Sequence, residues 1–73
     1  MHMNQNTLQR HEELADLMRK VNDASYRLHL ALFKFQAIAS YFDEIPEDRF
    51  AEVESAVAEV EDILTKIRAA LAE

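Results

Sequence analysis

Asp43-Glu44-Ile45-Pro46-Glu47-Asp48 is the stretch that decides the fold. Pro46 disfavours helical backbone at Ile45, the residue before it, and it is well suited to the first turn of a new helix. The acidic residues that follow favour the positive end of a helix dipole. The stretch therefore predicts a turn over residues 43–46 between two helices, one over about 7–42 and one over about 46–72.

Both flanking segments carry apolar residues at a seven-residue spacing, which is typical of a helix that packs along another helix. In the first helix the rows are Leu14, Val21, Leu28, Phe35 and Phe42; Leu17, Ala24, Ala31 and Ile38; and Met18, Leu32 and Ala39. In the second they are Val53, Val60 and Ile67; Ala56, Ile63 and Ala70; and Val57, Leu64 and Leu71. The sequence predicts an all-α antiparallel hairpin that forms one domain over 1–73.

The two repeats match when the chain folds back near residue 44. This register also places bases of the first helix beside acids of the second, although Lys20 then approaches Lys66. The second helix ends opposite about Asp16, so we expect Leu8 and the first turns of the first helix to lack a partner within the chain. The expected neighbours are Phe35 and Val53, Leu28 and Val60, Val21 and Ile67, Lys34 and Glu52, and Arg27 and Glu59.

The first helix has a further apolar stripe, on the side turned away from this seam. We call it the ridge; it consists of Tyr26, Leu30, Phe33, Ala37 and Tyr41. A helix that is apolar on every side is normally buried, and a hairpin would leave the ridge bare. Exposed apolar patches of a few hundred Å² usually mark an interface. The ridge is therefore the candidate interface, for self-association or for a different protein.

Size favours self-association. A compact protein of 73 residues and 8.5 kDa hides only about 60% of its unfolded surface. Such a chain is a weak monomer unless it shares a core with another chain, and twofold dimers are common. We expect two hairpins to pair into a homodimeric four-helix bundle. The sequence leaves open whether the helices of the two copies run parallel or antiparallel.

The residues needed for several kinds of chemistry are missing. The sequence has no Gly and no Cys, so Gly-rich phosphate loops and thiolate metal sites are excluded. Its three histidines, at positions 2, 11 and 29, have no metal-ligand spacing, and its paired carboxylates point apart on a helix. We therefore expect no enzyme activity, no catalytic residues, no metal and no cofactor.

Charge is unevenly distributed. Residues 1–42 carry a net charge of +1 and residues 43–73 a net charge of −7. The acidic second helix suggests one alternative, an inhibitor that imitates nucleic acid. The basic row of Lys20, Arg27 and Lys34 suggests another, because the architecture is similar to the small RNA-binding Rop-type bundles, although no sequence motif is shared. A helix lying on a membrane would need basic residues on its polar face instead.

The sequence as a whole favours a small non-enzymatic protein–protein interaction module, such as an adaptor, a chaperone-like factor or a regulator, acting as a homodimer. No signal peptide or membrane span is visible, so the cytoplasm is the expected location. The identity of any partner, the biological process, and whether Met1-His2 belongs to the natural chain stay open.

Overall fold

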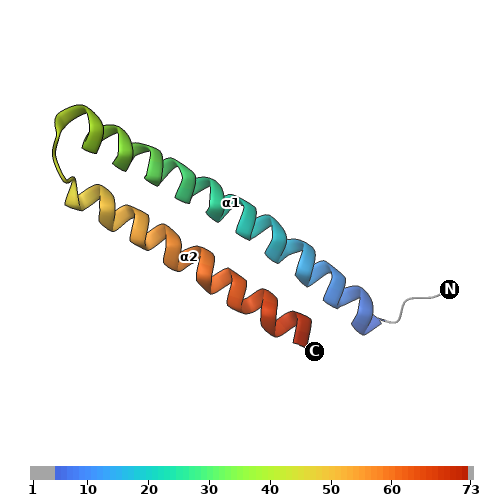
Figure 1. Ribbon diagram of the computed structural model, residues 1–73. Coiled ribbons are helices and arrows are strands. Elements are labelled where there is room, and N and C mark those ends of the chain that lie inside the picture. The colour runs from blue at the N-terminus through green and yellow to red at the C-terminus, as the bar shows by residue number, and fades with distance from the viewer. Residues whose placement is uncertain (1–4, 73) are drawn as a thin grey trace.

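A computed structural model describes residues 5–72 of the chain. It consists of two helices, α1 (Gln5–Phe42) and α2 (Glu47–Ala72), which run antiparallel and pack along their length (Figure 1). The predicted helical hairpin is thus confirmed. Met1 and His2, for which the sequence leaves open whether they belong to the natural chain, lie outside the described residues. The molecule is a rod with extents of 60 × 17 × 12 Å.

The turn between the helices is built without glycine. Asp43 takes up the left-handed backbone conformation, with φ at 52°, which Asp tolerates better than most residues and which commonly ends a helix. Pro46 is buried, and its carbonyl oxygen accepts a hydrogen bond from the Phe50 amide at 3.0 Å. Pro46 therefore stands at the cap of α2, immediately before the first helical residue.

Small side chains occupy the centre of the seam. The buried residues include alanines on both helices, and Ala24 has no exposed surface at all. Ala24 packs in one cluster with Leu17, Ile63 and Ala70. Small residues at the contact allow two helices to approach closely, so the hairpin is tight, but its core contains little apolar volume.

The register of the two helices agrees with the prediction. Arg27 on α1 binds Glu59 on α2, and Lys34 and Glu52 line the same hollow between the helices. The expected neighbour of Phe35 was Val53, and its ring also packs against that of Phe50, with the centroids 5.6 Å apart. Both the apolar spacing and the charges along its edge thus specify how the chain folds back.

Two expectations about the ends of the seam were wrong. The seven-residue spacing predicts that Phe42 lies in the seam, yet Phe42 is 65% exposed, because α2 begins only at Glu47 and lies beside earlier turns of α1. The start of α1 was expected to lack a partner, yet Arg10 donates a hydrogen bond to the Leu71 carbonyl oxygen at 2.9 Å. That bond satisfies a carbonyl at the C-terminus of α2, where a cation also suits the helix dipole.

Candidate interaction surfaces

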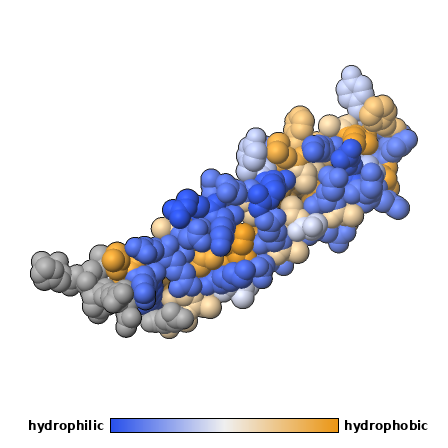
Figure 2. All heavy atoms as spheres, turned by 180° about the vertical axis from the view of Figure 1, so that it is seen from behind, coloured by the Kyte–Doolittle hydropathy of each residue, from blue (hydrophilic) through white to orange (hydrophobic). Residues whose placement is uncertain are grey.

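All five residues of the ridge are exposed. Tyr26 and Phe33 lie on the side of α1 away from α2, whereas Leu30 lies nearer to α2 and lines a hollow together with Glu59. Tyr26 and Phe33, one seven-residue repeat apart, are 63% and 65% exposed. Tyr41 is more exposed still, and its ring centroid lies 5.8 Å from that of Phe42. Towards the hairpin loop, exposed Phe42 and Ile45 extend this apolar surface. Figure 2 shows one long face of the rod, on which hydrophobic side chains gather at the loop end.

A second apolar surface spans both helices, and the sequence analysis did not distinguish it from the seam. We call it the open face. Its members are all exposed, and all except Phe50, near the start of α2, follow a seam residue by four positions: Met18, Leu32, Phe50, Val57, Leu64 and Leu71. Leu32 and Leu64 are each 39% exposed. The rows that contain Met18, Leu32, Val57, Leu64 and Leu71 had been grouped with the seam, but one partner helix is too narrow to cover three adjacent rows.

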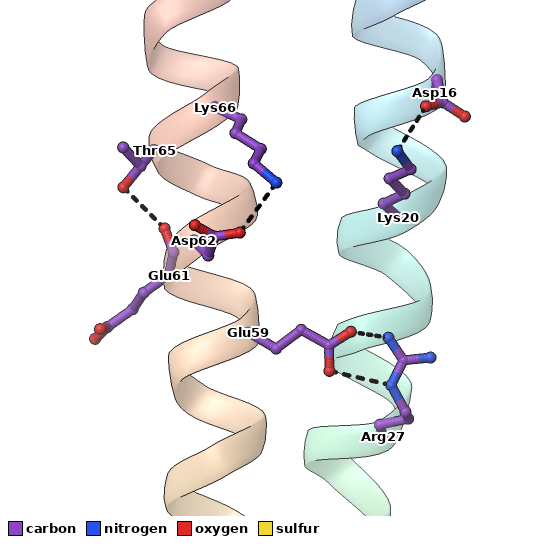
Figure 3. A network of polar contacts seen from close by, with 8 residues as sticks. All are labelled: Asp16, Lys20, Arg27, Glu59, Glu61, Asp62, Thr65 and Lys66. Carbon is purple, nitrogen blue, oxygen red and sulfur yellow. Dashed lines mark hydrogen bonds and ion pairs between the residues drawn. The ribbon is translucent and has the colours of Figure 1, made fainter.

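The opposite side of the seam is charged. We call it the charged flank; it includes Lys20, Arg27, Lys34, Glu52, Glu59 and Lys66. Glu59 reaches across from α2 and accepts two hydrogen bonds from the Arg27 guanidinium (Figure 3). This pairing raises the pKa of Arg27. The open hollows on this flank are lined by charged side chains together with a few apolar ones, such as Leu30 and Ile63, and they lack the apolar enclosure of a small-molecule site.

Lys20 and Lys66 line one hollow, as the register required, and each is neutralised within its own helix. Lys20 binds Asp16 at 3.1 Å, and Lys66 binds Asp62 at 3.1 Å (Figure 3). The hydrogen bond and charge of Lys20 lower the pKa of Asp16 from its ordinary value of 3.8, with a smaller contribution from Arg19. The like charges across the seam are thereby tolerated.

Several acids of α2 are also paired. Arg49 binds Glu52 at 3.1 Å, Arg27 binds Glu59, and Lys66 binds Asp62. Glu54 and Glu61 remain exposed on the outer part of the helix. Two of these pairs lie within α2 and are already counted in the net charge of residues 43–73, so only Arg27 neutralises a further acid of this segment.

Within residues 5–72, no three His, Asp or Glu side chains are grouped so that they could hold a metal ion. Neither described helix has a stretch apolar enough, over sufficient length, to cross a membrane.

Comparisons of the chain with protein-family models, with curated proteins and with solved structures gave no match.

Proposed function

We propose that this chain is a small non-enzymatic protein–protein interaction module that works as a homodimer and contacts a partner protein through the ridge. The observation that carries the proposal is the exposure of Tyr26 and Phe33, about two thirds each, on the side of α1 that α2 does not reach. Aromatic residues contribute disproportionately to protein interfaces. The complementary surface on the partner is an apolar groove that accepts one helix.

The shape of the ridge supports this use. Tyr26, Leu30 and Phe33 follow helical spacing, so they form a continuous strip along one side of α1. A partner can read such a strip as a series of anchors without disturbing the seam. Tyr26 and Tyr41 add hydroxyl groups, which can remain hydrated at the rim of a contact.

The alternatives raised by the charge pattern have less support. An acidic mimic needs unpaired carboxylates in an array, and Glu52, Glu59 and Asp62 are each bound to a base of the same chain. An RNA-binding row needs free bases, whereas Lys20 and Arg27 are bound to Asp16 and Glu59.

The proposal is tested by photo-crosslinking in the cells that produce the protein. A photoreactive phenylalanine analogue replaces Tyr26, and its adducts are compared in two further variants. Phe33→Glu places a charge in the middle of the ridge, which an apolar groove cannot accept without a large desolvation cost. Ala58→Glu is the control, because it adds the same charge at an exposed position of α2, away from the ridge.

We expect an adduct with a different protein that disappears in Phe33→Glu and persists in Ala58→Glu, with helix content unchanged by circular dichroism. Adducts that survive Phe33→Glu would contradict the proposal. An adduct between two copies of the chain alone would also contradict it, because the ridge would then be used for self-contact.

A further inference from the structure

The core of the hairpin is one-sided. The row at the centre of the seam, which includes Ala24 and Ile63, is buried. In the adjacent row, Val53 is buried, whereas Val21 and Val60 pack against this cluster but are only half-buried. The row beyond it, with Leu32 and Leu64, is exposed. Burial therefore decreases step by step from the seam towards one side of the molecule.

The ion pair between Arg27 and Glu59 shows which side is open. Arg27 comes one position before the seam residue Leu28, and Leu32 comes four positions after Leu28. In a seven-residue repeat these two spacings place Arg27 and Leu32 on opposite sides of the seam. Glu59 and Leu64 are related to Val60 in the same way. Because Arg27 binds Glu59 on one side, the apolar residues of both helices share the other side and form one surface.

The open face is free of the charge that would oppose a second copy. Two copies of an acidic chain, with a formal charge of −6 each, repel one another wherever like charges meet. None of the six residues of the open face is ionisable. The charged flank, in contrast, would place Arg27, Glu59 and their neighbours in a contact where they would lose hydration.

The exposed area of the whole chain is large enough for contact with a second copy. The chain has 5966 Å² of accessible surface, whereas a compact protein of its mass exposes about 4,700 Å². The excess, about 1,300 Å², is larger than the roughly 800 Å² per partner that a standard interface buries. The radius of gyration, 17.3 Å, likewise exceeds the value of about 11 Å expected for a compact chain of this length.

From these observations we infer that the open face is the self-association surface and that a second copy of this chain covers it, which completes a four-helix bundle. The contact buries the exposed row and completes the burial of the half-buried row behind it. Tyr26 and Phe33 of the ridge lie on the outer side of α1 and stay accessible in this dimer. The inference rests on the proposed function for the dimeric state. It deepens that function by assigning self-association to the open face and partner binding to the ridge.

The test uses the unaltered chain. Sedimentation equilibrium is expected to give twice the chain mass of 8.5 kDa. In a sample that mixes ¹³C-labelled and unlabelled chains, isotope-filtered NMR is expected to show contacts between copies from the methyl groups of Leu32 and Leu64. A single-copy mass at high micromolar concentration would overturn the inference, including the case in which a different protein covers the face. Intermolecular contacts confined to the ridge or the charged flank would overturn it as well.

A pair of variants provides an independent check. Leu64→Glu is expected to weaken self-association by about 100-fold or more, because the new carboxylate would be buried without a partner. Ala58→Glu, which adds the same charge at an exposed position on the outer side of α2, is expected to leave the dimer intact. A dimer that persists in Leu64→Glu would overturn the inference. Failure of the proposed function appears instead as loss of the partner adduct with the dimer unchanged, so the two outcomes are distinguishable.

Discussion

Arg27 of α1 and Glu59 of α2, 32 positions apart in the sequence, are joined by two hydrogen bonds across the seam, and the one from Nε of Arg27 to Oε2 of Glu59 measures 3.3 Å. Both side chains are about half exposed, so the pair contributes little to stability compared with apolar burial. Its value lies in register: a shift of one helical turn would separate the two groups and place Glu59 beside other acids or apolar residues.

The first prediction is a charge reversal at this pair. Arg27→Glu alone and Glu59→Arg alone each bring like charges together, so each should lower the melting temperature. The double variant restores opposite charges and should recover most of the loss. Thermal unfolding followed by circular dichroism at low ionic strength measures all three. Equal melting temperatures for the singles and the double would show that the pair does not couple, and added salt should reduce the differences because both groups are exposed.

The second prediction concerns Asp16, whose pKa Lys20 lowers. A carboxyl group with a lowered pKa in the folded state stabilises the fold above its ordinary pKa, and this contribution is lost as the pH falls through the lowered value. Lys20→Gln should therefore raise the pKa of Asp16 towards 3.8 and reduce the dependence of stability on pH in the acid range. NMR titration of the Asp16 carboxyl carbon measures the shift directly. Lys66→Gln is the control, since Lys66 binds Asp62 instead, and it should leave Asp16 unaffected.

The third prediction concerns Asp43, which takes up a left-handed backbone conformation in a chain without glycine. Asp43→Gly removes the clash of Cβ in this conformation and is expected to change the free energy of unfolding by about 0–1 kcal/mol in the stabilising direction. Asp43→Val places a β-branched side chain there and should destabilise by about 1–2 kcal/mol. Urea unfolding of both variants gives the comparison. A valine variant as stable as the glycine variant would mean that the turn does not depend on this conformation.

Much of this fold could be predicted from the sequence, because a seven-residue repeat and a single proline leave few alternatives for a chain of this length. The number of apolar rows that the seam buries could not be predicted in this way. Three apolar rows look equivalent in the sequence, and only the packing of one helix against one other shows that the row of Leu32 and Leu64 is left uncovered. The ends of the seam were also misplaced, at Phe42 and at Arg10, because caps and the loop set helix ends, whereas periodicity does not.

Of the two apolar surfaces, one could be predicted from the sequence and the other could not. The ridge is visible from helical spacing alone, since Tyr26 and Phe33 lie on the side of their helix opposite the seam residues. The open face requires the register as well, because its residues come from two helices that meet only in the folded chain. Charge adds what spacing lacks: the pairing of Arg27 with Glu59 shows which side of the seam is polar, and hence which side is available for an apolar contact.

The fourth prediction tests the tightness of the seam at Ala24, which has no exposed surface and packs in the cluster that contains Ile63. A larger side chain there must push the helices apart or adopt a strained rotamer, and overpacking of this kind costs about 1–3 kcal/mol. Ala24→Leu should therefore lower the free energy of unfolding although it adds apolar volume. Ala58→Leu, the same change at an exposed position of α2, should leave the midpoint of urea unfolding nearly unchanged. If Ala24→Leu instead raised the midpoint, the seam would contain unfilled space, and the close approach of the two helices at this alanine would be refuted.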